Sequence, residues 1–556
     1  MTPEEIADSV LAAVRAAAAA GDLALAEADL PTHTTVERPK VREHGDYATN
    51  VAMQLAKRAG RPPREVADVV AVRLAKTPGI ARVDVAGPGF LNIVLDAAAQ
   101  GEVAATVLRE GVAYGRSDVL TGTRVNLEFI SANPTGPLHL GHTRWAAVGD
   151  AMARVLIAAG ADVAREFYVN DRGVQMDRFG ASVAAAAAGE PAPADGYHGS
   201  YIRDLAEQIV AEHPEYAALT GDERLQAFRE EGYRVQLAEQ QRVLDDFGTH
   251  FDVWSSERAL VASGAVDRAL TRLREQGHLF EQDGAVWLRT TDFGDDKDRV
   301  LVKVDGELTY LAPDTAYYVD KRERGFDVCI YLLGADHHGY VQRLKAVAAC
   351  AGDDPEKNIE VLIGQLVKIL RDGEEVRLSK RAGDLVTLQD FVDEVGVDAA
   401  RYSLSRYPAD SPLTLDIAVL TARKNENHVY YVQYVAARTA SVNRNAAELG
   451  LTLGTPDDFV PALLDGETEG ELLGLLGEFP RVVATAAELR EPHRVARYLE
   501  ELAGRYHRFY DACRILPVGD EPVTTLNVAR LWLNAATRQV IENGLDLLGV
   551  SAPERM

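Results

Sequence analysis

Residues 124–169 contain the pattern that most restricts the fold of this chain. Arg124–Ile130 alternates apolar and polar side chains, as a half-buried strand does. A loop with prolines and a glycine follows, and an apolar helix is then expected from about Thr143 to Ala159, before a second strand at Val163–Val169. Because parallel strands joined by a helix form a right-handed βαβ unit, the pattern predicts a Rossmann-like parallel sheet. Ligands of such sheets bind at the carboxyl ends of the strands.

The α/β pattern resumes at Val328–Leu333, after residues 180–300, which we interpret as an insertion between two halves of the sheet. At 556 residues the chain is too long for one compact core. Alanine-rich helices and two short strands predict an α+β domain at residues 1–110, and helical periodicity predicts an all-α helical bundle at 426–556. The Rossmann-like domain then spans residues 118–425.

Composition excludes several classes of protein. The formal net charge of −26 argues against indiscriminate nucleic-acid binding, although a local basic face can still bind RNA. The three cysteines, Cys329, Cys350 and Cys513, are too scattered for a disulfide framework or a CxxC zinc site. No apolar run is long enough to span a bilayer, and the N-terminus is acidic where a signal peptide needs basic residues. We therefore expect a cytoplasmic protein without zinc or a membrane partner.

A histidine motif lies between the first predicted strand and its helix, where Pro137-Leu-His139-Leu-Gly141-His142 occurs. Both histidines can donate hydrogen bonds to ATP phosphate oxygens, next to the free N–H groups of a helix N-terminus. Gly141 allows a nucleotide to approach the backbone closely. The alternatives are a chance coincidence and a zinc site, and the absence of a nearby cysteine or third histidine argues against zinc.

A second motif, Arg377-Leu-Ser379-Lys380-Arg381, follows a hairpin predicted around Asp372-Gly373. A mobile lysine can fold over a triphosphate and stabilise the charge that develops as pyrophosphate leaves. Alone, the motif would indicate only a solvated basic loop. Together with the histidine motif it predicts an ATP site that includes Ser379 and Lys380, with His139, His142 and Lys380 as catalytic groups.

The two motifs resemble the signatures of class I aminoacyl-tRNA synthetases. Longer segments are similar to arginyl-tRNA synthetases, namely Gly45–Asn50, Gly87–Asn92, Glu128–His139, Phe167–Gln175, Leu308–Tyr310, Gly334–Tyr340, Asn427–Arg438, His507–Arg514 and Gly549–Met556. The resemblance implies a ligase that activates L-arginine with ATP and Mg²⁺ and transfers it to tRNA(Arg). It also implies an N-terminal domain that contacts the tRNA and a helical domain that binds the anticodon. We expect a monomer.

The resemblance assigns residues to two binding sites. The positions that surround arginine in the family correspond to Glu128, Ser131, Asn133, His142, Tyr310, Asp314 and His337. Carboxylates beside tyrosines suit a guanidinium, which pairs with carboxylates and stacks on aromatic rings. The candidate tRNA contacts are Tyr430, Arg438, Arg494, Arg505, Tyr510 and Arg514. Without the resemblance, Asp314 would be interpreted as a surface acid and each arginine as part of a solvated stripe.

The sequence departs from the family in places. Some relatives have glutamine near position 337, and Arg377 and Leu378 replace the usual lysine and methionine of the second signature.

Three alternatives for the function are open. A synthetase for another amino acid is one, with cysteine the nearest rival, but the cysteine enzyme's resemblance implies zinc-binding cysteines that this chain lacks. A non-catalytic tRNA-binding paralogue is disfavoured by His139, His142 and Lys380. A P-loop ATPase is disfavoured because GxxxxGK[ST] does not occur.

Overall fold

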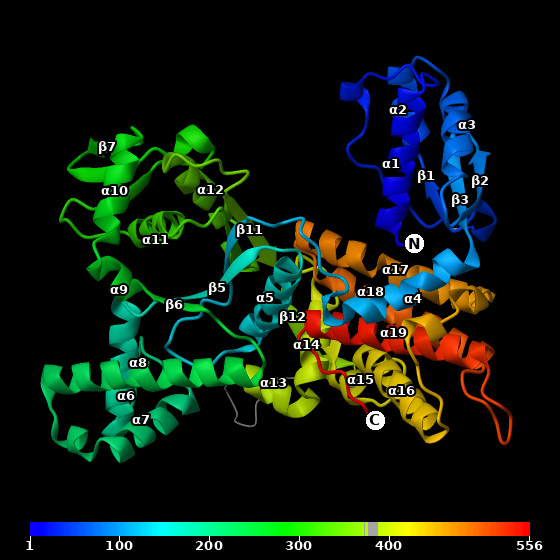
Figure 1. Cartoon of the computed structure of the whole chain (residues 1–556). Helices are drawn as coiled ribbons and strands as arrows, with labels where there is room; N and C mark the ends of the chain where they lie inside the picture. Colours follow the sequence, from blue (N-terminus) through cyan, green and yellow to red (C-terminus); the bar gives the residue numbers. More distant parts are fainter. Residues whose placement is uncertain (40, 372, 376–386) are drawn as a thin grey trace.

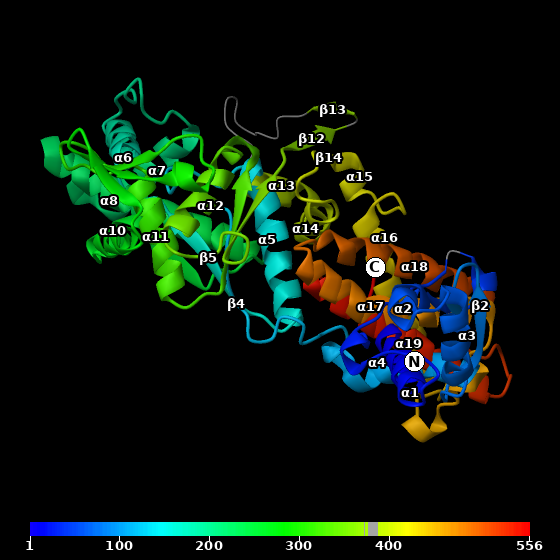
Figure 2. The same cartoon turned by 90° about the horizontal axis from the view of Figure 1, so that it is seen from above.

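The computed structural model describes residues 1–39, 41–371, 373–375 and 387–556. A central α/β domain lies beside a helical domain, and a small N-terminal domain packs on the far end of the helical domain (Figures 1 and 2). Within the described residues, no helix is long and apolar enough to cross a membrane.

The central sheet has five parallel strands in the order β11-β10-β4-β5-β6. Their bounds are β4 Arg124–Glu128, β5 Asp162–Val169, β6 Val253–Ser256, β10 Val328–Gly334 and β11 Ile359–Gly364. The chain proceeds outward from β4 through β5 to β6, and then returns to add β10 and β11 on the opposite side of β4. The order therefore reverses between β4 and β10, and open α/β sheets bind ligands in the crevice at such a reversal. The predicted Rossmann-like parallel sheet is confirmed.

The helix of the predicted βαβ unit is α5, Leu140–Ala158, which is capped by His139 and so starts earlier than expected. It runs between the sheet and the helical domain, as both views show (Figures 1 and 2). Gly149 explains its close approach to the sheet, because a Cβ there would lie 2.4 Å from the ring of Phe129. The first strand and the helix of the histidine motif are thus packed without a gap.

A different hydrophobic core packs against each face of the sheet. In β10, Ile330 and Leu332 pack with α5 and the helical domain, whereas Cys329 and Tyr331 face α11, Leu311–Glu323, and α12, Tyr340–Cys350. This alternation follows from the two-residue period of a strand. Because helices cover both faces, ligands can approach only along the edge of the sheet.

The predicted insertion at 180–300 is not one continuous unit. The helices α6, Val174–Ala187, α7, Ser200–Glu212, and α8, Gly221–Asp246, form a lobe with its own apolar core. The chain then returns to the sheet, where β6 pairs with β5, before it forms α9, Glu257–Ala262, α10, Ala265–Glu275, and a three-stranded antiparallel sheet. That small sheet comprises β7 Leu279–Gln282, β8 Ala285–Leu288 and β9 Arg299–Val302. The sequence did not reveal β6 because it has only four residues, all half-buried.

The N-terminal domain ends earlier than residue 110. Its core contains residues 6–95 and is built from three helices and a sheet of order β1-β3-β2. Their bounds are α1 Pro3–Ala19, α2 Val51–Ala59, α3 Pro63–Leu74, β1 Tyr47–Thr49, β2 Ile80–Ala86 and β3 Phe90–Leu95. The next helix, α4, Ala97–Glu110, instead buries Val103 and Val107 in the core of the helical domain.

The helical domain contains four long helices, α16 His428–Glu448, α17 Glu467–Glu488, α18 His493–Ala512 and α19 Thr525–Leu547. The expected apolar face of α18 is confirmed, since the following side chains are all buried: Val495, Leu499, Leu502, Tyr506, Phe509 and Cys513. The hairpin predicted near residue 373 is also present, with β12, Val367–Arg371, antiparallel to β13, Glu374–Glu375. A third strand, β14, Leu413–Asp416, pairs with β12 in parallel.

Candidate active site

His139 forms the N-cap of α5, and its Nδ1 accepts a hydrogen bond from the N–H of Gly141 at 3.0 Å. Burial lowers the pKa of His139, so the ring is neutral near pH 7. A neutral imidazole has one protonated nitrogen, and an accepting Nδ1 therefore leaves the proton on Nε2. The cap fixes His139 as a hydrogen-bond donor through Nε2, at the positive end of the helix dipole.

His142 lies against His139, with ring centroids 3.8 Å apart. Burial, with a smaller contribution from His139, lowers the pKa of His142 to about 3. Its Nδ1 is buried and has no hydrogen-bond partner among the described residues. A buried imidazole nitrogen without a partner is costly unless a ligand satisfies it. The predicted pair of phosphate donors is thus neutral rather than cationic.

Two residues of the second motif lie outside the described residues: Ser379, predicted to bind ATP, and Lys380, predicted to bind ATP and to be catalytic. The described chain after the second motif approaches the first motif. Thr387 forms a β-bridge with His139, and the N–H of Leu388 donates to the carbonyl of Leu138 at 2.8 Å. Described residues that follow the second motif are therefore joined to the first motif by backbone pairing.

Three carboxylates gather near the carboxyl ends of β4 and β5. Asp314 lies in the first turn of α11, Glu257 opens α9, Glu257–Ala262, and Glu128 ends β4. Burial, followed by the charges of Glu128 and Glu257, raises the pKa of Asp314 to about 7, although Arg343 opposes this rise. Burial also raises the pKa of Glu257, against the opposing effect of Tyr168. An excess of negative charge in a poorly solvated place favours a cationic ligand.

Glu128 differs from the other two because it already has a cationic partner. Its Oε2 accepts from Nζ of the fully buried Lys321 at 2.5 Å, and its Oε1 accepts from Ser131 at 3.0 Å. The ammonium of Lys321 also lies 4.1 Å from the ring centroid of Tyr317 and 4.0 Å from that of Tyr331. Glu128 is thus held in an internal ion pair. Of the three carboxylates, those of Asp314 and Glu257 are the least neutralised by nearby cations.

The backbone after β4 is strained. Ile130 has φ 68° and Ser131 has φ 44°, in the left-handed region that non-glycine residues avoid. Ser131 Oγ both donates to Glu128 and accepts from the N–H of Tyr168 at 3.1 Å, which links β4 to β5. Such strain persists only where surrounding contacts impose it, and it is concentrated at functional sites.

The remaining predicted arginine contacts are less closely assembled. Tyr310, at the N-cap of α11, is 83% exposed, and the exposed Asn133 donates to Gln175 at 2.9 Å. His337 lies in the short 3₁₀ turn after β10, where its ring is 5.8 Å from that of Tyr340. The structure brings together Glu128, Ser131 and Asp314, while Tyr310 extends into solvent.

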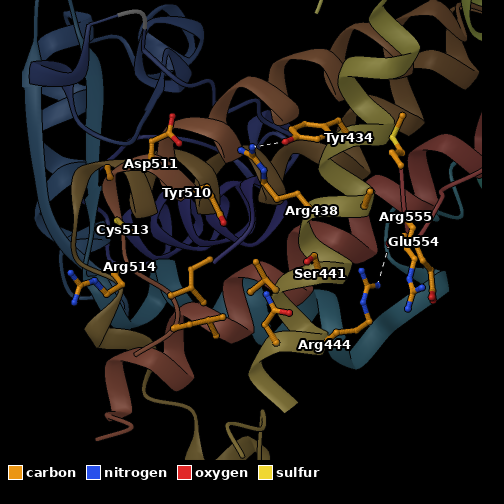
Figure 3. Close-up of a pocket in the computed structure, with 17 residues that line it drawn as sticks. Tyr434, Arg438, Ser441, Arg444, Tyr510, Asp511, Cys513, Arg514, Glu554 and Arg555 are labelled. Carbon is orange, nitrogen blue, oxygen red and sulfur yellow. Dashed lines mark hydrogen bonds between the residues drawn. The ribbon is translucent and has the colours of Figure 1, made fainter. Parts of the chain in front are cut away.

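A groove of about 920 Å³ opens in the helical domain between α16, the end of α18 and the C-terminus. Arg438 is stacked between two tyrosines there, with its guanidinium carbon 4.6 Å from the ring centroids of both Tyr434 and Tyr510, as Figure 3 shows. Arg444, Arg514 and Arg555 also line the groove. Aromatic rings interleaved with arginines suit unpaired bases and a phosphate backbone.

The other predicted tRNA contacts lie elsewhere. Tyr430 lines a separate hollow beside Asn427 and Gln433, and Arg494 and Arg505 line a second groove of about 960 Å³. That second groove lies between α17, α18 and the N-terminal domain. Arg494 pairs with Glu491 and Arg505 with Glu471, so both arginines have internal acidic partners.

Three consecutive parts of the chain match known protein families. Residues 4–95 match the "Arginyl tRNA synthetase N terminal domain", residues 104–416 the "tRNA synthetases class I (R), catalytic domain", and residues 432–556 the "DALR anticodon binding domain". An arginine–tRNA ligase of Kineococcus radiotolerans is 58% identical over 556 residues, and one of Frankia alni is 59% identical over 556 residues. Each similarity covers the whole of both chains. The chain belongs to the arginyl-tRNA synthetase family.

It is therefore an arginine–tRNA ligase of class I, an enzyme whose substrates are arginine, ATP and tRNA. The arginyl-tRNA synthetase of Thermus thermophilus has the same fold, with a TM-score of 0.74 over all of both chains at 23% identity. The reversal of strand order between β4 and β10 thus lies in the class I catalytic domain of an arginyl-tRNA synthetase.

Sequence reasoning missed several residues of this arginyl-tRNA synthetase site. Glu257 belongs to no motif, and its only local signal is the helix cap by Ser256, whose side chain accepts from the N–H of Ala259. Lys321 was indistinguishable from a surface lysine, because its burial depends on partners 193 residues away. The periodicity of α11 could have shown that Tyr317 and Lys321 share a face with Asp314, at spacings of three and four residues.

One further group of ligand-type side chains lies far from the site. Glu212, His213 and Glu231 have ligand atoms within 4.8 Å of one another. Arg234, however, pairs with Glu212 at 2.7 Å and with Glu231 at 2.6 Å. The ion pairs account for this arrangement without a metal ion.

Proposed function

We propose that this ligase works in two steps at the carboxyl edge of its five-stranded sheet. The carboxylate of L-arginine attacks the α-phosphate of ATP, the bond to the β-phosphate breaks, and arginyl-adenylate and pyrophosphate form. A terminal ribose hydroxyl of tRNA(Arg) then attacks the activated carbonyl, which releases AMP. The observation that supports this site best is the poorly compensated charge of Asp314 and Glu257 near the end of β4, the strand that precedes the histidine motif, in a chain of this family.

Arginine is held by its side chain in this proposal. The guanidinium pairs with Asp314, and Glu257 lies close enough to add a second negative charge. Glu128 contributes mainly by fixing Lys321 and Ser131, whereas Tyr310 folds over the bound side chain from its exposed position. The contacts proposed for the rest of the amino acid are Ser131, Asn133, His142 and His337. Because a guanidinium has only donors, a pocket of acceptors selects it against neutral side chains.

ATP is held at the start of α5. Pro137, His139, Gly141 and His142 surround the phosphates, and the neutral histidines donate hydrogen bonds to their oxygens. Ser379 and Lys380 are proposed from the sequence alone to reach the same phosphates, where Lys380 stabilises the departing pyrophosphate. Mg²⁺ accompanies ATP as its usual counter-ion, and no zinc is required.

The helical domain supplies the anticodon site in this proposal. Arg438 and Tyr510 in the groove of Figure 3 provide a stacking surface, and Arg514 provides a phosphate contact. Tyr430, Arg494 and Arg505 are assigned to peripheral contacts, because they lie outside that groove. The N-terminal domain adds tRNA contacts. The enzyme acts as a cytoplasmic monomer.

The test is a panel of amino acids, including cysteine and lysine, in aminoacylation assays with purified tRNAs. We expect charging of tRNA(Arg) with arginine only. Asp314→Asn should lower kcat/KM for arginine by about 10²–10⁴-fold, because a donor then faces a donor in a poorly solvated pocket. Asp320→Asn is the matched control, since Asp320 lies on the same helix but pairs with Arg324 at 2.9 Å. Equal losses in both variants would refute the assignment of Asp314.

A further inference from the structure

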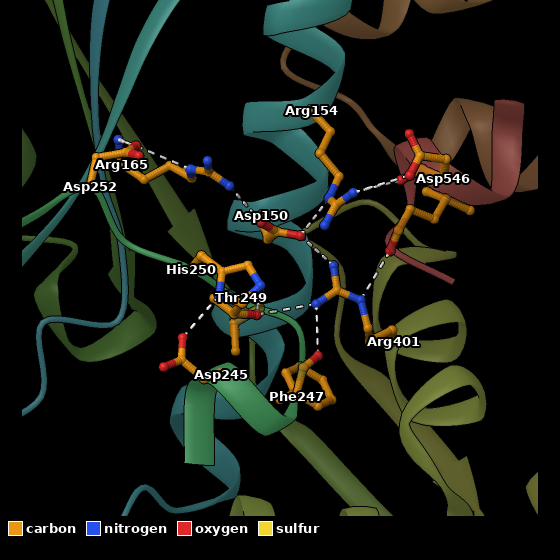
Figure 4. A network of polar contacts seen from close by, with 12 residues as sticks. Asp150, Arg154, Arg165, Asp245, Phe247, Thr249, His250, Asp252, Arg401 and Asp546 are labelled. Carbon is orange, nitrogen blue, oxygen red and sulfur yellow. Dashed lines mark hydrogen bonds and ion pairs between the residues drawn. The ribbon is translucent and has the colours of Figure 1, made fainter. Parts of the chain in front are cut away.

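The middle of α5 contains a fully buried acid, Asp150, that binds three arginines. Its carboxylate oxygens lie 2.5 Å from Arg401, 2.7 Å from Arg154 and 3.3 Å from Arg165 (Figure 4). Burial alone would raise the pKa of Asp150, but Arg401 and Arg154 outweigh burial and hold the pKa below its usual value. Asp150 is therefore a buried, ionised carboxylate that joins three arginines to the middle of α5, the helix that begins with the histidine motif.

Arg401 connects this carboxylate to two other segments. It belongs to α14, Val397–Ser405, and is itself fully buried. Its Nη1 donates to the carbonyl of Phe247 at 3.0 Å and to Thr249 at 3.2 Å, and its Nε donates to the carbonyl of Leu548 at 3.2 Å. A planar guanidinium can hold these partners at once, whereas a lysine ammonium cannot match the geometry.

A second contact leads from Arg401 to the start of α5. The hydroxyl of Thr249, which accepts from Arg401, donates to the carbonyl of Ala146 at 2.9 Å. Ala146 lies one helical turn after His142. Arg401 therefore holds α5 at two points, near its first turns through Thr249 and at its middle through Asp150.

The contact with Leu548 leads in the opposite direction, to the C-terminus. Gly549 follows α19 with φ +65°, and a Cβ there would lie 2.1 Å from Nη2 of Arg401. Two residues later, Ser551 is bonded to Asp398 of the same helix as Arg401. The chain ends with residues 554–556, which line the arginine- and tyrosine-lined groove of Figure 3. One buried side chain thus connects the lining of that groove with the catalytic helix.

We propose that Asp150 and Arg401 are positioning residues for arginine activation: their ion pair transmits the placement of residues 548–556 to the first turns of α5. This inference rests on the proposed roles of His139 and His142 and of the groove. A helix moves as a unit, so a displacement at Asp150 reaches both histidines. Displacements on the order of 1 Å at reacting groups can lower rates by about 10²-fold.

The test uses Arg401→Lys in the full-length enzyme, with arginine, ATP and tRNA. Asp150 keeps Arg154 and Arg165 as partners, so the variant leaves no unpaired buried acid. We expect kcat for the charging of tRNA with arginine to fall about tenfold or more. The KM values for arginine and ATP should stay within about twofold, because the groups that bind these substrates are retained and only their alignment changes. The control is Arg406→Lys, since Arg406 also joins α14 to the helical domain, through Glu500 at 2.6 Å. Equal losses of kcat in the two variants, or unchanged kcat in a folded Arg401→Lys enzyme, would overturn the inference.

A second variant examines the pathway itself. Gly549→Ala adds a methyl group against Arg401, and we expect kcat to fall in the parent enzyme. In the Arg401→Lys background the same change should cost less, because both act through one contact and their effects are then not additive. Fully additive effects would contradict the inference. If the parent enzyme fails to charge tRNA with arginine, the proposed function is wrong instead, so the two failures are distinguishable.

Discussion

Charge balance at single residues determines which ligand the catalytic pocket can accept. Glu128, Glu257 and Asp314 contribute three carboxylates, whereas Lys321 is committed to Glu128 and Arg343 only partly offsets the raised pKa of Asp314. A carboxyl group in such a place binds a proton when no cation is present. In the proposed site the guanidinium of arginine replaces that proton, so the same physical effect that raises the pKa of Asp314 would also make the site selective for a cation.

The first prediction concerns pH. Asp314 has a pKa of about 7 without arginine, and the ligand binds the deprotonated form. Protons therefore compete with arginine below pH 7, and the dissociation constant for arginine should rise about tenfold from pH 8 to pH 6. The pKa of His142 is about 3, so that ring does not titrate in this range. Calorimetric titration of the enzyme with arginine at several pH values measures the effect.

Two variants identify the group responsible. Asp314→Asn should bind arginine weakly at all pH values, with a flat profile. Glu257→Gln removes one of the charges that raise the pKa of Asp314, and should therefore move the midpoint to lower pH without abolishing it. A pH profile that is unchanged in Asp314→Asn would assign the titration to another group.

At the scale of single residues, the sequence could identify side chains of the required type, but not which of them form ion pairs with one another. His139, His142 and Asp314 were predicted because motif and resemblance carry residue types. Whether a carboxylate is free depends on which distant cation reaches it, and Glu128 is engaged by Lys321 from 193 residues away. Glu257 has no motif at all. The sequence therefore identified candidate residue types without showing which carboxylate lacked a cationic partner.

At the scale of elements, the start of α5 determines how His139 is oriented. Gly141 is in the first turn, and a Cβ there would lie 2.8 Å from Cε1 of His139 and 2.9 Å from its Nδ1. Any side chain at position 141 would therefore displace the ring that caps the helix. Glycine itself weakens a helix, so its presence reflects the requirements of the site rather than helix stability.

The second prediction is that Gly141→Ala separates stability from activity. Alanine in a helix is favoured over glycine by about 0.5–1 kcal/mol, whereas loss of the His139 cap costs about 0.5–2 kcal/mol, so the two effects largely offset and the free energy of unfolding should change by only about 1 kcal/mol. The rate of arginine activation should nevertheless fall by about 10-fold or more, because His139 loses its cap and its alignment with the phosphates. Urea unfolding and ATP–pyrophosphate exchange with tRNA present measure the two quantities. A variant as active as the parent would mean that His139 tolerates displacement.

The sequence predicted helices and strands correctly where the hydrophobic periodicity and the residues that end an element indicated the same boundaries. β4, α5 and β5 follow a clear alternation, a proline-containing loop and a stop at Gly160, which has φ +93°. It failed at β6, because four half-buried residues carry too little pattern. Hydrophobic periodicity also shows that a helix has a buried face without showing what covers that face. For this reason α4 was assigned to the wrong core.

At the scale of the whole molecule, α4 is the connection between the N-terminal and helical domains. Its backbone passes so close to Pro461 that a Cβ at Gly101 would lie 2.4 Å from that carbonyl oxygen. Just beyond α4, the Tyr114 hydroxyl donates to the carbonyl of Leu476 at 2.9 Å. The N-terminal domain itself meets α17 mainly through polar contacts, such as Arg481 with the carbonyl of Val36 at 2.9 Å. The physical boundary therefore lies before α4, near residue 96.

The third prediction follows from that boundary. An enzyme that lacks residues 1–95 should remain folded and keep its KM for arginine, because the apolar cores on the two sides of residue 96 are separate. Its KM for tRNA should rise, with a shallower salt dependence, since phosphate contacts are lost. Removal of residues 1–110 should in addition lower the free energy of unfolding by about 3–5 kcal/mol, because it deletes the buried side chains of α4. Circular dichroism during urea unfolding compares the two truncations, and equal stability would place α4 with the N-terminal domain after all.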